Sequence, residues 1–139
     1  MSSSYTRFRY HLVFSTKSRQ PYITPDVELL VYKALHRRAE DVGAKIMALN
    51  GIVDHVHLVV AIPPTLRVSD FVREIKTSST RSIRKIVPHL HLLFEWQNGY
   101  GGFTLDADNL GGVIAYVNHQ KEHHTQNTLI EKYEKTTDD

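Results

Sequence analysis

Two histidines, His55 and His57, interrupt an apolar run in the segment GIVDHVHLVVAI, residues 51–62. Successive side chains of a strand point to opposite faces, so the two imidazoles share one face, about 6.5 to 7 Å apart at Cβ. That separation suits two ligands of one metal ion. Most isolated His-x-His pairs are structural, however, and the chain holds a second pair, His89 and His91, after Pro88 at the end of a basic segment. The first pair needs further residues before it indicates a site.

Such residues occur in the segment VIAYVNHQKEHH near the C-terminal end. Tyr116 and Gln120 are four residues apart and therefore lie on one face of a helix, with His119 and His123 beside them. A tyrosine hydroxyl can attack a phosphodiester, and a glutamine carbonyl can join a set of oxygen and nitrogen ligands. Taken singly, a tyrosine packed on a sheet and a glutamine at the surface are the commoner roles. The chain has no cysteine, which excludes thiolate nucleophiles, disulfides and cysteine-ligated metal sites.

The elements that must position these residues follow from the periodicity of apolar residues and from the turn residues. The expected order is strand, helix, strand, strand, helix, strand and an extra helix. This is the split βαβ pattern of an α+β, ferredoxin-like sandwich, in which an antiparallel sheet has helices on one face and the first and third strands are central. The expected ranges are a strand at 8–16, a helix from Pro25 to about Val42 with Thr24 as N-cap, strands at about 44–50 and 53–62 joined by a turn at Asn50-Gly51, a helix at about 68–86, a strand at 93–97, the glycine-rich loop NGYGGF and a helix at about 109–124.

Length and composition favour one domain over residues 1–139, with a core at about 8–124 and a C-terminal tail at 125–139. Arg7, Arg9 and His11 break the N-terminal apolar run, and no stretch of about 20 apolar residues is present to span a membrane. We therefore expect no membrane association and a cytoplasmic location. The formal net charge is only +2. Its distribution is more informative, because basic residues gather between Arg67 and Lys85.

Five segments occur in an order and at spacings that resemble the single-tyrosine HUH transposases, the enzymes of insertion sequences that move as single-stranded DNA. The segments are YHLVFSTKSRQP, DHVHLVVAIPP, IKTSSTRSI, WQNGYGGFTL and YVNHQKEHH. The resemblance implies that His55 and His57 are metal ligands, that Gln120 is the third ligand and that Tyr116 is the nucleophile. It also implies Mg²⁺ or Mn²⁺ as the cofactor, and both ions accept oxygen and imidazole ligands.

The reaction implied by the resemblance is nicking and rejoining of single-stranded DNA next to hairpins, through a 5′-phosphotyrosine intermediate. One phosphodiester replaces another, so joining needs no ATP. The resemblance further implies a homodimer, and it leaves open whether Tyr116 serves its own subunit or the partner. One departure concerns His119, which stands where the family usually has asparagine. We interpret His119 as a spectator rather than a competing ligand.

Basic residues are the expected contacts for DNA phosphates, because a polyanion releases counterions when cations neutralise it. Aromatic side chains that could stack on unpaired bases are Tyr22, Trp96, Tyr100 and Phe103, although core packing is the commoner role of Trp96 and Phe103. The predicted phosphate contacts are Lys17, Arg19, Arg67, Arg73, Lys76, Arg81, Arg84 and Lys85.

Two alternatives remain open on the sequence. The two His-x-His pairs could belong to a two-histidine phosphodiesterase, although neither pair has a hydroxyl residue at the expected third position. The chain could also be an inactive nucleic-acid-binding regulator on the same fold. Against the regulator, Tyr116, His55, His57 and Gln120 are all present.

Overall fold

The computed structural model of the chain describes residues 4–137, and its centre is an antiparallel sheet of four strands in the order β2-β3-β1-β4. β1 and β3 are the central strands and pair along their whole lengths, from Arg9↔Ala61 to Ser15↔His55. The expected α+β fold with central first and third strands is therefore confirmed. The strands are β1 (Arg9–Ser15), β2 (Lys45–Ile52), β3 (His55–Ala61) and β4 (Gly101–Leu105).

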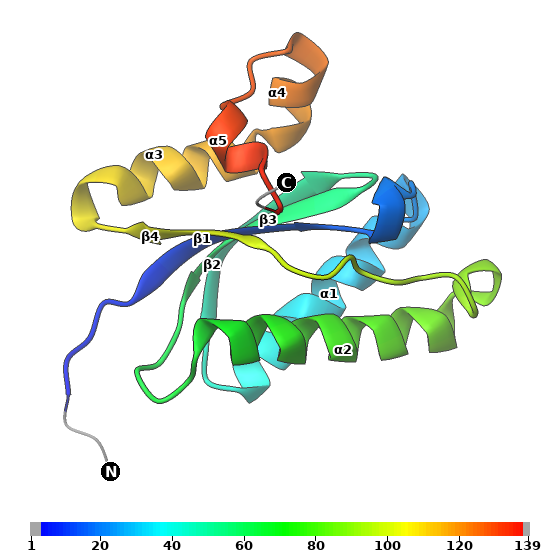
Figure 1. Cartoon of the computed structure of the whole chain (residues 1–139), viewed down its shortest axis with the longest axis horizontal. Helices are drawn as coiled ribbons and strands as arrows, with labels where there is room; N and C mark the ends of the chain where they lie inside the picture. Colours follow the sequence, from blue (N-terminus) through cyan, green and yellow to red (C-terminus); the bar gives the residue numbers. More distant parts are fainter. Residues whose placement is uncertain (1–3, 138–139) are drawn as a thin grey trace.

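Helices cover both faces of the sheet (Figure 1). α1 (Pro25–Asp41) and α2 (Val68–Ile86) lie on one face, as predicted. The C-terminal helices lie on the other face, and they are α3 (Ala107–Asn118), α4 (Gln120–Gln126) and α5 (Glu131–Glu134). Two short 3₁₀ turns, η1 (Lys17–Arg19) and η2 (Pro88–Leu90), complete the elements. Within residues 4–137, none of the helices has the length and apolar character needed to cross a bilayer.

Alternation along the central strands decides which side chains face which helices. Leu12, Phe14, Leu58 and Val60 point into the main core with α1 and α2. Their sequence neighbours point to the opposite face, where Val59 packs with side chains of α3. His55 and His57 share the parity of Val59, so the histidines stand on the face covered by the C-terminal helices. The two-residue period therefore separates the main core from the face that carries the histidines.

The predicted turn at Asn50-Gly51 is wrong by three residues. β2 continues through both residues, with Gly51 paired to Val56, and the turn falls at Val53-Asp54. A Cβ on Gly51 would lie 2.1 Å from the carbonyl oxygen of His55. Gly51 is therefore needed for the close approach of two strands, a role that a glycine inside a strand often has.

The predicted fourth strand at 93–97 is also wrong. In that range, Trp96 alone forms a β-bridge, which pairs it with Thr16. The strand that pairs with β1 at this edge is β4, which overlaps the stretch predicted to be a loop. The glycines of β4 again mark a close approach, because a Cβ on Gly101 would lie 2.7 Å from Val13 Cγ1. The alternation of Phe94 and Trp96 with polar residues, which predicts a strand, arises because both rings enter the core. Their exposed fractions are 0% and 6%.

The predicted final helix over 109–124 is two helices. α3 starts at Ala107 after Asp106, which forms a capping box with Asn109. It ends at Asn118, and His119 leaves helical geometry with φ −106° and ψ 25° before α4 begins at Gln120. Tyr116 and Gln120 therefore stand on different helices that meet at His119.

Candidate active site

The two histidines of β3 are buried, and their inner nitrogens converge. Nε2 of His55 and Nε2 of His57 lie 3.0 and 3.2 Å from the same oxygen, Oε1 of Glu134. The outer nitrogens are also held: Nδ1 of His55 is 2.8 Å from Oδ1 of Asp54, and Nδ1 of His57 is 3.0 Å from Nε2 of His11. Outer partners of this kind fix the orientation and tautomer of ligand histidines.

Tyr116 and Gln120 reach the same carboxylate from the C-terminal helices. The Tyr116 hydroxyl donates to Oε2 of Glu134 and accepts a hydrogen bond of 3.1 Å from the backbone N–H of Ile130. Nε2 of Gln120 donates to Oε1 and Oε2 of Glu134, at 3.1 and 3.0 Å. The structure thus brings together His55, His57, Tyr116 and Gln120, all within one chain.

Glu134 joins these side chains, and sequence reasoning missed it. The residue lies on α5, in a stretch predicted only as a tail, and nothing in the sequence TLIEKYEK distinguishes it from Glu131. His124, also missed, places Nε2 3.3 Å from Oε1 of Glu134. Two other missed residues had a signal: Asp54 directly precedes the His pair, and His11 alternates with core residues in β1.

His119 lies apart from the cluster. Its Nδ1 is 2.8 Å from the carbonyl oxygen of Ala115, and its side chain is exposed. The second histidine pair is also separate, because His89 and His91 are exposed around η2, beyond the end of α2. Within residues 4–137, the structure therefore gives no two-pair arrangement of the kind a two-histidine phosphodiesterase requires.

The electrostatics of the cluster follow from burial and from the one carboxylate. Burial would raise the pKa of Glu134, but hydrogen bonds from His55 and His57 outweigh it and hold that pKa well below its usual range. Burial, and then the Glu134 carboxylate, raise the pKa of the Tyr116 phenol. The pKa of His55 is raised, because the Asp54 and Glu134 carboxylates together outweigh its burial. The nucleophile candidate is therefore a neutral phenol at pH 7.

The types of donor atom in the cluster suit a divalent cation. Oε1 of Gln120 is buried and has no hydrogen-bond partner, and the inner nitrogens of His55 and His57 point to one place. An unpartnered buried oxygen is rare and calls for an explanation. Two imidazoles and an amide oxygen form a ligand set that Mn²⁺ and Mg²⁺ both accept. The carboxylate of Glu134, with His55 and His124, forms a second group of potential ligands, all within 4.8 Å of one another.

The basic residues predicted to contact DNA are not gathered at this cluster. α2, which carries five of them and has Arg67 as its N-cap, covers the opposite face of the sheet (Figure 1). Several are engaged within the chain: Arg73 pairs with Asp70, Arg84 donates to the Phe94 carbonyl, and Lys17 pairs with Glu95. The side chains of Arg67, Arg81 and Lys85 are exposed.

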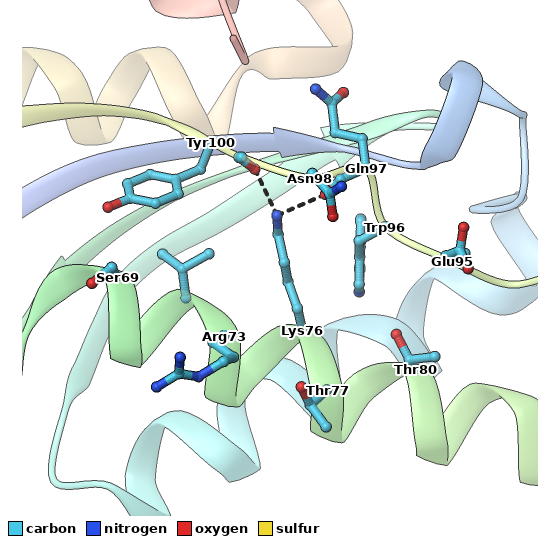
Figure 2. A pocket seen from close by; sticks show the side chains of 12 residues that line it. Ser69, Arg73, Lys76, Thr77, Thr80, Glu95, Trp96, Gln97, Asn98 and Tyr100 are labelled. Carbon is cyan, nitrogen blue, oxygen red and sulfur yellow. Dashed lines mark hydrogen bonds between the residues drawn. The ribbon is translucent and has the colours of Figure 1, made fainter.

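Lys76 lies in a hollow of about 460 Å³ between α2 and the loop that leads to β4 (Figure 2). Its Nζ donates to the carbonyl oxygens of Gln97 and Gly99, at 2.9 and 2.6 Å, and burial lowers its pKa to about 8. In this position Lys76 anchors the loop. Of the predicted stacking residues, Tyr100 and Trp96 both line this hollow, and Trp96 is largely buried and donates to Ser79.

Arg19 is the predicted cation that lies beside the cluster. Its guanidinium nitrogen lies 3.8 Å from Oδ1 of Asp54, and its side chain lines a hollow of about 380 Å³ together with Glu134 and Lys135. Phe103 and Tyr22, the remaining predicted aromatics, are partly buried: Phe103 packs on His11 and Tyr22 packs on Phe94. The hollow beside Glu134 is therefore next to η1.

Known proteins similar in sequence are transposases. Residues 4–120 match the family described as Transposase IS200 like. The transposase for insertion sequence element IS200 of Salmonella typhimurium is 27% identical over 127 residues, which cover 87% of this chain and 83% of that protein. The ISDra2 transposase TnpA of Deinococcus radiodurans is 23% identical, over 84% of this chain and 86% of that protein.

Solved structures give the same picture. A candidate transposase from Deinococcus radiodurans R1 superposes with a TM-score of 0.70 at 26% identity, covering 86% of this chain and 95% of that one. A REP-associated tyrosine transposase bound to a REP hairpin superposes with a TM-score of 0.65 at 15% identity, covering 93% of this chain and 76% of that one. The second likeness is a likeness of fold.

Proposed function

Because the chain belongs to the IS200-like transposase family, we propose that it nicks and rejoins single-stranded DNA beside hairpins through a phosphotyrosine on Tyr116. The observation that supports this proposal is the convergence of a buried phenol with two imidazoles whose inner nitrogens meet at one point. A relative of the same fold was solved with a hairpin bound, which supports a hairpin as the DNA feature recognised.

In the proposed reaction, the phenolic oxygen of Tyr116 attacks the scissile phosphorus in line. The new bond is a 5′-phosphotyrosine, the bond from phosphorus to the 3′-oxygen breaks, and the 3′-oxygen takes up a proton as the phenol releases one. Attack of a 3′-hydroxyl on the phosphotyrosine reverses these changes and joins the strands. The chain contributes the position of the nucleophile, which α3 holds against the face that carries His57, with ring centroids 6.0 Å apart.

His55, His57 and Gln120 would hold Mg²⁺ or Mn²⁺, and such an ion, when bound, supplies positive charge to the phosphate oxygens in the transition state. Asp54 and His11 would keep the imidazoles oriented, as their contacts with the outer nitrogens indicate. We further propose that the chain works as a homodimer, because two DNA ends must be held and a twofold pair is the commonest assembly. The position of Tyr116 favours action in its own subunit.

The test is a covalent adduct. The purified chain is incubated with Mn²⁺ and single-stranded hairpin DNA taken from the sequence that flanks its gene, and the products are separated on a denaturing gel. We expect a protein–DNA adduct that Tyr116→Phe abolishes. Tyr133→Phe is the matched control, because its ring lies beside that of Tyr116 with centroids 5.4 Å apart. Cleavage without an adduct would favour a phosphodiesterase, and binding without cleavage would favour an inactive regulator.

A further inference from the structure

We propose that the C-terminal segment, residues 128–137, is an internal competitor of DNA that places the Glu134 carboxylate where the scissile phosphate must bind. The inference rests on the proposed function, because it assigns a phosphate position between Tyr116 and the histidine pair. It assigns a regulatory role to a stretch that sequence reasoning treated as a tail. The arguments are the contacts of the carboxylate, the path of the segment and its exposure.

The carboxylate of Glu134 makes the contacts that a reacting phosphate needs. One oxygen faces Nε2 of His55 and Nε2 of His57, and the other accepts from the Tyr116 hydroxyl. A phosphodiester poised for attack must likewise place one oxygen on the metal side and its phosphorus about 3 to 3.5 Å from the phenolic oxygen. One planar anion fills the gap between nucleophile and imidazoles. Glu134 and a scissile phosphate therefore exclude each other by space, and by charge as well.

The rest of the segment covers the nucleophile. The backbone N–H of Ile130 donates to the Tyr116 hydroxyl, so both hydrogen bonds of that group go to the segment. The ring of Tyr133 packs against the ring of Tyr116, with centroids 5.4 Å apart. With these contacts in place, Tyr116 is only 4% exposed. A phenol covered in this way cannot reach a DNA strand until the segment moves.

The segment is attached at the surface in a way that permits release. α5 has only four residues, and Leu129 and Ile130 are 37% and 42% exposed. The anchor after Glu134 is Thr136, 5% exposed, whose Oγ1 lies 3.3 Å from Oε1 of Gln97. The hollow beside Glu134, lined by Arg19 and Lys135, is open to solvent. A short terminal segment with exposed apolar side chains belongs to the low-stability part of a fold, which opens without global unfolding.

The experiment compares the full chain with Glu134→Ala, Glu134→Gln and Glu131→Ala. Glu131 lies on the same short helix and is exposed, so its loss changes the net charge equally without touching the carboxylate cluster. Binding of fluorescent single-stranded hairpin DNA is measured by anisotropy with Mn²⁺ in a Tyr116→Phe background, where no adduct can form. The rate of adduct formation is measured with Tyr116 intact, and Mn²⁺ affinity is measured by calorimetry without DNA.

We expect Glu134→Ala to tighten DNA binding at least about fivefold and to speed adduct formation to a similar degree, because apparent affinity scales with the competent fraction. Glu134→Gln keeps the size and loses the charge, and we expect a smaller gain in the same direction. Glu134→Gln also tests the competition if Glu134→Ala fails to fold. Mn²⁺ affinity should stay equal or rise, and Glu131→Ala should stay within about twofold of the wild type.

Three results would overturn the inference. A fall in Mn²⁺ affinity with slower adduct formation would make Glu134 a metal ligand. Slower adduct formation at unchanged Mn²⁺ affinity would make it a proton acceptor. Unchanged DNA binding would remove any competition. The proposed function is tested separately: if no protein forms an adduct but Glu134→Ala binds DNA more tightly, the transfer reaction is wrong and the competitor stands.

Discussion

At the scale of single residues, the candidate site depends on what stands behind each histidine. The carboxylate of Asp54 holds the outer nitrogen of His55, and the imidazole of His11 holds that of His57. Burial and the neighbouring His57 lower the pKa of His11 to about 3, so His11 is neutral at physiological pH. The two histidines therefore have different supports, one anionic and one neutral.

The anionic support can be tested by Asp54→Asn, which keeps the shape of the side chain and removes its charge. We expect Mn²⁺ affinity to fall roughly tenfold, because outer partners that orient ligand histidines usually contribute that much. Isothermal titration calorimetry measures the change. Asp70→Asn, which breaks the pair with Arg73 on α2, is the matched control and should leave Mn²⁺ affinity unchanged. Equal affinity in both variants would mean that Asp54 has no part in the site.

Lys76 gives a pH-dependent prediction away from the site. Burial lowers its pKa from 10.5 to about 8, so the folded chain loses this proton at lower pH than the unfolded chain does. Between about pH 8 and 10.5 the unfolded state binds more protons at this group, so its contribution to stability rises with pH. We expect the difference in unfolding free energy between wild type and Lys76→Met to change in the wild type's favour by less than about 1 kcal/mol from pH 7 to 9, because Lys76 is only partly buried. Denaturant titrations at both pH values measure it, and an opposite sign would contradict the lowered pKa.

At the scale of elements, the glycines divide into those that permit close approach and those that do not. A Cβ on Gly101 would lie 2.1 Å from the carbonyl oxygen of Lys135, in the C-terminal segment. A Cβ at Gly111 or Gly112, on α3, would meet nothing within 4 Å. The two groups should therefore respond to alanine in opposite directions.

We expect Gly111→Ala and Gly112→Ala each to raise the free energy of unfolding by about 0.5 to 1 kcal/mol, because alanine is a better helix former than glycine. Gly101→Ala should lower it by about 1 to 3 kcal/mol, the usual cost of overpacking. Denaturant unfolding monitored by circular dichroism measures all three. A stabilised Gly101→Ala would mean that the segment at Lys135 yields without cost.

The elements with a full period of apolar residues could be predicted from the sequence. α2 has its expected bounds, Val68–Ile86, because its buried positions recur every three or four residues. The errors lie where glycine has two physical uses. The sequence predicts Gly51 in a turn and Gly101 in a loop, but both stand in strands where neighbouring backbone comes too close for a Cβ. The periodicity of one segment carries no information about such a neighbour.

In the candidate site too, residues set by local spacing could be predicted, and a residue set by tertiary contacts could not. His55, His57, Tyr116 and Gln120 could be placed together from local spacing and a resemblance, and the structure brings them to one carboxylate. Glu134 could not be found, because its role depends on the path of a short terminal segment. The fragment that contains it has no periodicity that fixes its direction. Tertiary contacts alone, such as the Lys135 carbonyl against Gly101, determine that path.

At the scale of the whole molecule, the sheet separates the candidate site from most of the residues predicted to contact DNA. The candidate site lies on the face covered by the C-terminal helices, and most of the predicted DNA-binding residues lie on α2, across the sheet (Figure 1). Arg19 is different, because it lines the hollow that contains Glu134. We therefore expect the affinity for single-stranded DNA to depend more on Arg19, in η1, than on the basic residues of α2.

This arrangement predicts unequal effects of two arginines. Arg19→Ala should weaken binding of single-stranded DNA and reduce the slope of log affinity against log salt by about 1, as the loss of one phosphate contact does. Arg81→Ala, an exposed cation of α2, is the matched control and should change affinity less. Anisotropy titrations over a range of salt concentrations measure both slopes. A larger effect at Arg81 would move the DNA path to the other side of the sheet.

The interruption at His119 has a mechanical meaning. A continuous helix would couple every displacement of the Tyr116 ring to the amide of Gln120, one turn later. Because the backbone leaves helical geometry between them, α3 and α4 are two helices joined at one residue, His119, and we expect that residue to act as a hinge. When Tyr116 carries a DNA strand, we expect α3 to rotate about His119 while the amide of Gln120 on α4 keeps its position.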